Sequence, residues 1–144
     1  MPHASLTRRI AFAAAHRYRR AEWSEEKNAE VFGACANPHF HGHSYACWVT
    51  VHGEIDAVTG MVIDLGLLDR VLQAEVRARF DHRNINLEVA EFGEGKLIPT
   101  GENLARLIAE WVALALAAAN YKAIVHRVVI WEDDALAAEF VPER

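Results

Sequence analysis

The sequence predicts an α+β fold with the element order ββααββ, in which two helices cover one face of an antiparallel sheet. Two strand-like segments stand near the N-terminus, two segments with helical spacing follow them, and two more strand-like segments end the chain. A length of 144 residues, with 52% hydrophobic and 24% charged residues, fits one globular domain, residues 1–144, that has a sizeable core.

The two N-terminal strands are expected over residues 5–16 and 41–54. Side chains alternate between the faces of a strand, so the first strand presents one apolar set and the second continues from a histidine pair into aromatic and β-branched residues. The residues expected to share one face of the first strand are Ile10, Phe12, Ala14 and His16, and those expected to share one face of the second are His41, His43, Tyr45, Cys47, Val49 and Val51. Residues 17–40 form a long connection, and connections of this length are often functional.

The two helices are expected over residues 65–80 and 102–119. Asp64 can cap the first, whose apolar stripe contains Leu68, Leu72 and Val76. Thr100 can cap the second and Asn120 can end it. Residues 81–100 are expected to be irregular. The last two strands are expected over residues 124–131 and 135–141, with a turn at Asp133-Asp134.

Composition excludes several classes of function. A net charge of −5 leaves no basic surface of the kind that binds nucleic acid. Two cysteines make no disulfide framework and suit a reducing compartment. No apolar run reaches the roughly 20 residues that span a bilayer. We therefore expect a cytoplasmic protein that binds neither nucleic acid nor membrane.

Three histidines can form a metal site. His41 and His43 are two residues apart on one strand and so share a face, and His16 ends the neighbouring strand. Three imidazoles leave one coordination position of a tetrahedral zinc ion open for water or substrate. The alternative is that these are ordinary surface or core histidines, since the chain contains 8.

Other residues could take part in catalysis. Cys35 lies six residues before His41, where a nearby cation would lower the pKa of its thiol and make it a base or nucleophile; the alternative is a buried loop cysteine. Asp81 can orient His82 for proton transfer, or the pair can simply end a helix. Cys47 and the remaining histidines are interpreted as core, structural or surface residues; these histidines are His3, His39, His52 and His126.

Two glutamates could bind a planar donor. Glu132, at the end of a strand, can accept two hydrogen bonds from a 2-amino-pyrimidinone, or it can be a solvent-exposed strand terminus. Glu102 can hold the same kind of donor, or it can interact with the dipole of the second helix.

Six motifs and Glu132 occur in order between about residue 8 and residue 140. The motifs are Phe12-Ala13-Ala14-Ala15-His16, Phe32-Gly33-Ala34-Cys35, His41-Gly42-His43-Ser44-Tyr45, Gly60-Met61-Val62-Ile63-Asp64, Asp81-His82-Arg83-Asn84-Ile85-Asn86 and Pro99-Thr100-Gly101-Glu102-Asn103. In these motifs the chain resembles the 6-pyruvoyl-tetrahydropterin synthase family, which includes the 6-carboxy-tetrahydropterin synthases of queuosine biosynthesis.

The resemblance implies the tunnelling fold, in which subunits close into an oligomeric barrel, as a hexamer of two trimers with active sites between subunits. It implies a zinc-dependent lyase that acts on 7,8-dihydroneopterin triphosphate. The implied roles are zinc ligation by His16, His41 and His43, catalysis by Cys35, Asp81 and His82, with the last two reaching a neighbouring subunit's site, and pterin binding by Glu132, Glu102 and Thr100.

The product that we expect is 6-pyruvoyl-tetrahydropterin, with release of triphosphate, and the alternative is the 6-carboxy-tetrahydropterin of queuosine biosynthesis. The five residues between Cys35 and His41 resemble the pyruvoyl synthases, whereas carboxy synthases usually have three. A non-catalytic zinc- or pterin-binding protein and an aldol-type cleavage are further alternatives. Departures from the commoner family pattern occur at Ser44, Leu65 and Asp133, and none removes a catalytic group. The cations considered for the triphosphate are Arg17, Arg19 and Lys27.

Overall fold

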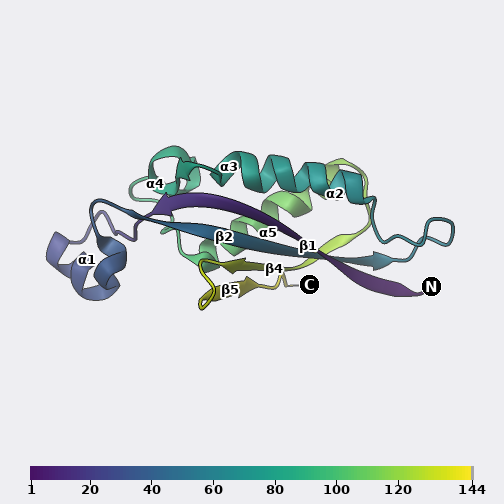
Figure 1. Cartoon of the computed structure of the whole chain (residues 1–144), viewed down its shortest axis with the longest axis horizontal. Coiled ribbons are helices and arrows are strands. Elements are labelled where there is room, and N and C mark those ends of the chain that lie inside the picture. Colours follow the sequence, from purple (N-terminus) through teal and green to yellow (C-terminus); the bar gives the residue numbers. More distant parts are fainter. Residues whose placement is uncertain (144) are drawn as a thin grey trace.

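A computed structural model describes residues 1–143 and contains a five-stranded sheet with helices packed on one face (Figure 1). The spatial order of the strands is β3-β1-β2-β4-β5. Their bounds are β1 His3–His16, β2 His41–Glu54, β3 Arg83–Asn84, β4 Ile124–Trp131 and β5 Ala137–Phe140. The mixed α+β class is confirmed, but the sheet is not wholly antiparallel, because the two-residue β3 runs parallel to β1 at one edge.

The pairing of β1 with β2 positions the histidines. The antiparallel register runs without a break from His3 opposite Glu54 to His16 opposite His41. Phe12, Ala14 and His16 are buried on the face that the helices cover, as the alternation predicts. β2 continues the sheet into β4, with a bulge between Thr50 and Val51.

The expected helix over residues 65–80 is present, but it is not a regular α-helix throughout. It consists of α2 (Leu65–Leu72), a π-helical segment (Gln73–Arg77) and α3 (Ala78–Phe80). The Asp64 carboxylate accepts a hydrogen bond from the Leu67 backbone N–H at 2.9 Å, which confirms the predicted cap.

The long helix α5 (Gly101–Ala118) has the predicted ends. The Thr100 hydroxyl accepts a hydrogen bond from the Asn103 N–H at 3.1 Å. Asn120 adopts a left-handed backbone conformation with φ of 62°, and the Tyr121 N–H donates to the Leu116 carbonyl at 3.0 Å. The bond to Leu116 terminates the helix because it satisfies a carbonyl group that the last turn leaves free.

The core lies between the sheet and these helices. It contains the alternate residues of β2 together with the apolar stripes of α2 and α5; the fully buried side chains include Tyr45, Cys47, Val49, Leu68, Leu72, Leu104 and Ile108. The core assignment of Cys47 is confirmed. On the opposite face of the sheet, Trp48 and Trp131 remain more than a third exposed.

Two segments predicted to be irregular contain short elements. The connection over residues 17–40 includes α1 (Glu25–Phe32) and a 3-10 turn (Gly33–Ala36), which lie beyond the end of the sheet (Figure 1). Residues 81–100 include β3, α4 (Ile85–Glu88) and a 3-10 turn (Ala90–Phe92). α1 buries only Asn28, so the sequence has no apolar stripe that would predict this helix. Ser24 caps its N-terminus, a position that serine favours.

Among residues 1–143, no helix is both long and apolar enough to cross a bilayer.

Candidate active site

The three predicted metal ligands meet at one end of β1 and β2. His16 is the last residue of β1 and lies opposite His41, while His43 lies two residues further along the same face of β2. One nitrogen from each ring lies within 4.8 Å of a nitrogen from each of the others. Each pair of rings meets edge to face, with centroids 4.6 to 5.1 Å apart.

His16 is held in one orientation. Its side chain is completely buried, and its Nδ1 lies 2.7 Å from the Pro99 carbonyl oxygen, to which it can only donate. The proton therefore sits on Nδ1, and Nε2 keeps the lone pair that a metal ion would need. Burial lowers the pKa of His16 to about 4, and the charges of His41 and His43 act in the same direction. The ring thus stays neutral at physiological pH.

The donor set fits a zinc ion. The Nε2 atom of His43 is buried and has no hydrogen-bond partner among the described residues. A buried polar atom without a partner is unusual, and a metal ligand is one of the few roles that explains it. The three imidazoles could supply three of the ligands of a zinc ion, which would leave a position open for substrate.

Cys35 lies in the 3-10 turn that precedes β2 and is partly exposed. The Tyr18 N–H donates to the Cys35 carbonyl at 2.7 Å, which ties this turn to the chain just beyond β1. Burial raises the pKa of the Cys35 thiol, and the charge of Glu132 raises it further. The protein groups around Cys35 therefore do not lower the pKa of its thiol. A lowered pKa, as the sequence suggested, would need the charge of a bound cation.

Glu132 follows β4 directly and is buried, so it is not the solvent-exposed strand terminus of the alternative interpretation. The Tyr18 hydroxyl donates to its Oε1 at 3.3 Å. Burial raises the pKa of Glu132, while the charge of His43 and the hydrogen bond from Tyr18 lower it. The carboxylate is thus close to both the histidine triad and the thiol.

A narrow slot of about 280 Å³ opens at Glu132. Its lining residues are Tyr18, Gly101, Glu102, Glu132, Leu136, Ala137 and Ala138. A Cβ atom on Gly101 would lie 3.1 Å from the Ala138 Cβ and 3.7 Å from Glu132 Oε1, so glycine keeps this wall thin. Glu102 lines the slot as the sequence suggested, whereas the Thr100 hydroxyl is engaged in capping α5.

Asp81 and His82 lie at the edge of β1, away from this slot. The Asp81 carboxylate accepts a hydrogen bond from the Ala13 N–H at 2.9 Å and lies 3.1 Å from Nδ1 of His82. The hydrogen bond from Ala13 is the largest cause of the lowered pKa of Asp81. The His82 side chain is 84% exposed on a left-handed backbone with φ of 59°. Within residues 1–143, His82 makes no hydrogen bond to Cys35 or to the triad.

The three cations considered for the triphosphate differ in their surroundings. Arg19 pairs with Glu25 at 2.8 Å and with Glu94 at 3.2 Å. Lys27 lies over the Trp23 ring at 4.4 Å, and Arg17 lies over the Phe40 ring at 5.6 Å. Arg17 also lines a second pocket, which opens between the α1 loop and residues 86–97.

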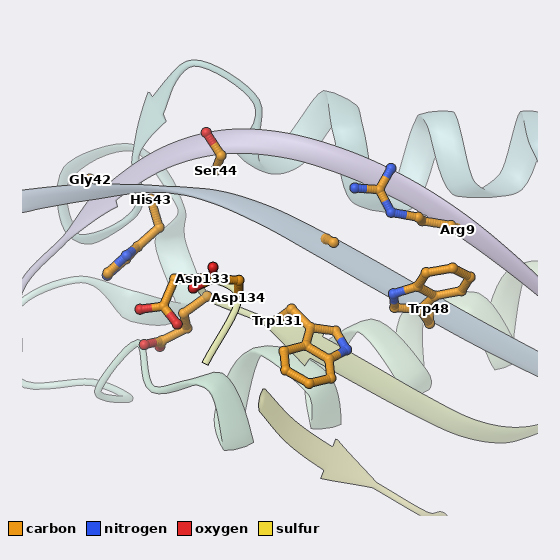
Figure 2. A pocket seen from close by; sticks show the side chains of 10 residues that line it. Arg9, Gly42, His43, Ser44, Trp48, Trp131, Asp133 and Asp134 are labelled. Carbon is orange, nitrogen blue, oxygen red and sulfur yellow. The ribbon is translucent and has the colours of Figure 1, made fainter. Parts of the chain in front are cut away.

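His43 also lines an open pocket on the exposed face of the sheet. Figure 2 shows His43, Asp133 and Asp134 at one end of this pocket and Trp48, Trp131 and Arg9 at the other. Glu132 lines it as well, so the site is accessible from this face.

The chain is similar to known proteins over most of its length. The model of the family described as 6-pyruvoyl tetrahydropterin synthase matches residues 5–143. The chain belongs to the 6-pyruvoyl tetrahydropterin synthase family. The human 6-pyruvoyl tetrahydrobiopterin synthase is 37% identical over 131 residues, which cover 91% of this chain and 86% of that protein.

A solved structure of this family has the same fold. The Caenorhabditis elegans 6-pyruvoyl tetrahydropterin synthase superimposes with a TM-score of 0.90 at 30% identity, over 99% of this chain and 98% of that one. A Rickettsia typhi protein named 6-carboxy-5,6,7,8-tetrahydropterin synthase is 30% identical over 112 residues, which cover 69% of this chain and 72% of that protein.

Tyr18 lies in the candidate site but was not predicted from the sequence. It stands two residues after His16, so the alternation that places His16 in the site also directs Tyr18 toward it. The strand ends at His16, however, and no pattern in the sequence links Tyr18 with Glu132, 114 residues away.

Proposed function

We propose that this chain, acting as one domain over residues 1–144, is a zinc-dependent lyase that converts 7,8-dihydroneopterin triphosphate to 6-pyruvoyl-tetrahydropterin and releases triphosphate. The observation that supports this most directly is that three histidines, with ring nitrogens within 4.8 Å of one another, lie near the buried Glu132 carboxylate, which lines a slot. The human relative, 37% identical, is named for the corresponding synthase activity.

His16, His41 and His43 would hold the zinc ion through three nitrogen atoms. When bound, the ion would supply Lewis-acid polarisation of the hydroxyl groups on the substrate side chain, which acidifies the neighbouring C–H and O–H bonds. The buried, partnerless Nε2 of His43 supports this assignment.

Glu132 would bind the pterin ring. An ionised carboxylate accepts two parallel hydrogen bonds, which matches the amino group and ring N–H of a 2-amino-4-oxo-pyrimidine. Gly101 forms one wall of the slot without a Cβ, so room remains beside Glu132 for a flat ring. Glu102, on the same slot, and Thr100, just before it, are the further residues that we assign to pterin binding.

Cys35 would act as the base. Its thiolate would take a proton from the substrate side-chain carbon, and His82, oriented by Asp81, would move a second proton. Triphosphate would then leave by elimination. The hydrogens are redistributed within the substrate, so no nicotinamide cofactor is required, and the sequence has no glycine-rich dinucleotide-binding motif.

The active site would be shared between subunits. Asp81 and His82 lie at a sheet edge with the imidazole exposed, as expected of groups that serve a neighbouring copy. We therefore propose a homohexamer of two trimers whose sheets close into a barrel. The exposed Trp48 and Trp131 on the uncovered sheet face support burial of that face in an assembly.

The 6-carboxy-tetrahydropterin synthase reaction, which releases acetaldehyde and triphosphate from the same substrate, is the second candidate. The Rickettsia typhi relative favours it, whereas the five-residue spacing between Cys35 and His41 favours the pyruvoyl product. Either reaction needs a reduced Cys35, so we propose a cytoplasmic location.

Mass spectrometry of the reaction products tests these proposals. Zinc-loaded protein is incubated with 7,8-dihydroneopterin triphosphate, with the metal-free protein and the Cys35→Ala variant as controls. We expect triphosphate and 6-pyruvoyl-tetrahydropterin from the loaded protein only. A carboxylated pterin with acetaldehyde would establish the second candidate, and substrate binding without any product would favour a non-catalytic pterin-binding protein.

A further inference from the structure

Tyr18 contacts three parts of the candidate site. Its hydroxyl donates to Glu132 Oε1 at 3.3 Å, and its backbone N–H donates to the Cys35 carbonyl at 2.7 Å. The edge of its ring meets the His16 ring, with centroids 5.2 Å apart. One residue thus links the metal ligand, the thiol turn and the carboxylate.

The position of the Tyr18 ring does not depend on its hydroxyl group. The ring packs edge to face against Phe32, with centroids 5.9 Å apart, and against His16. A phenylalanine would keep both contacts and the backbone bond to Cys35. The hydroxyl therefore has a separable role, which is its hydrogen bond to Glu132.

That hydrogen bond restricts the carboxylate of Glu132. A carboxylate has about four acceptor positions on its two oxygens, and without a donor it can rotate about its terminal torsion. The Tyr18 hydroxyl occupies one position on Oε1 and so directs the others into the slot that both residues line. It also supplies a donor to a buried anion that has Glu102, a like charge, nearby.

We propose that Tyr18 is a positioning residue for the pterin ring, acting through Glu132. This inference rests on the proposed function, because it assumes that Glu132 binds the amino and ring N–H groups of a pterin. The Tyr18 hydroxyl holds the Glu132 carboxylate in the plane that the pterin ring must enter. Loss of the hydroxyl therefore weakens binding of the pterin ring more than it slows the chemistry on the side chain of the substrate.

The test compares Tyr18→Phe with Tyr121→Phe, a matched change at an exposed tyrosine beyond α5. Calorimetry measures binding of 7,8-dihydroneopterin, which has the ring but no triphosphate, and steady-state kinetics measures turnover of the triphosphate. For Tyr18→Phe we expect Kd and KM to rise about 10- to 150-fold, the range of one hydrogen bond to a charged group, with kcat changed less than about threefold. Tyr121→Phe should match the wild type.

A double-mutant cycle tests whether Tyr18 acts through Glu132. In a Glu132→Ala background, Tyr18→Phe should cause no further loss of binding, because the residue through which it acts is gone. Equal losses in both backgrounds, or unchanged Kd in Tyr18→Phe, would overturn the proposal. Binding is measured below the thermal transitions of all the variants, so reduced stability does not obscure the result.

The same data separate this inference from the proposed function. Wild-type protein that binds no dihydroneopterin would overturn both. Wild-type binding and turnover with an unaffected Tyr18→Phe variant would overturn the role of Tyr18 alone and leave the proposed function standing.

Discussion

The Nδ1 atom of His16 donates a hydrogen bond to the carbonyl oxygen of Pro99, 2.7 Å away, across 83 residues of sequence. The bond joins the end of β1 to the segment that leads into α5. It selects the tautomer in which Nε2 of His16 keeps its lone pair, so a backbone carbonyl prepares the metal ligand before any ion binds.

The first prediction concerns metal binding. His16→Ala or His43→Ala should reduce zinc affinity at least about 100-fold, since each removes one of three ligands from a site that keeps one position open. His52→Ala, on the opposite face of β2, is the matched control and should retain one zinc per chain. Metal content after dialysis against a weak chelator measures this, and full zinc retention in His43→Ala would contradict the assigned ligand set.

The second prediction concerns the stability of the metal-free protein in acid. The pKa of His16 is about 4 in the folded chain and about 6.5 when unfolded, so the unfolded chain binds the proton first as pH falls. The free energy of unfolding should be insensitive to this group above pH 6.5 and should decrease progressively between pH 6.5 and 4, by up to about 3 kcal/mol.

Urea unfolding of His16→Gln isolates this contribution. The difference in unfolding free energy between pH 7 and pH 4.5 should be smaller in His16→Gln than in the wild type, while His52→Gln should behave as the wild type. An equal acid sensitivity in all three proteins would show that protonation of His16 does not oppose folding.

The third prediction separates the two cysteines. Cys35→Ala should reduce turnover by about two to four orders of magnitude while zinc content stays at the wild-type level, because it removes the base and no ligand. Cys47→Ala should lower the free energy of unfolding by about 1 kcal/mol, because this side chain is completely buried, and should retain turnover. Turnover assays and urea unfolding distinguish these outcomes, and an active Cys35→Ala variant would exclude the thiol as base.

The fourth prediction concerns the wall of the slot. Gly101→Ala would add a Cβ 3.1 Å from that of Ala138, so β5 must shift and the slot must change shape. We expect 7,8-dihydroneopterin binding to weaken about 3- to 10-fold, the scale of one misplaced contact. Gly66→Ala in α2 is the control, since its added Cβ would meet only side-chain ends of Arg70 and Asp64, at 3.4 Å. Calorimetry on both variants decides, and equal binding would exclude a tight wall at Gly101.

The fifth prediction tests sharing of the site between subunits. Cys35→Ala and His82→Ala should each be inactive alone, but a mixed assembly formed by co-expression should recover up to about a quarter of wild-type activity, because about that share of sites combines two intact partners. Turnover of the purified mixture measures this. No recovery, in assemblies shown by mass spectrometry to contain both variants, would mean that each site uses residues of one subunit.

Sequence patterns predicted the parts of this molecule that depend on near neighbours. The alternation of β1 and β2 predicted that His16, His41 and His43 share a face, and the caps at Asp64 and Thr100 follow from side chains that bond to backbone groups three residues on. The ends of β4 and α5 were close to the prediction for the same reason.

The tertiary structure alone decided the contacts that complete the site. The hydrogen bonds from His16 to Pro99 and from Tyr18 to Glu132 join residues 83 and 114 positions apart, and no local pattern specifies such pairs. α1 escaped prediction because it buries only Asn28 and therefore has no apolar stripe. Local preferences determined the strand face on which the three histidines lie. Packing of α5 against the sheet determined which residues they contact, because burial and long-range pairing act only once the chain has folded.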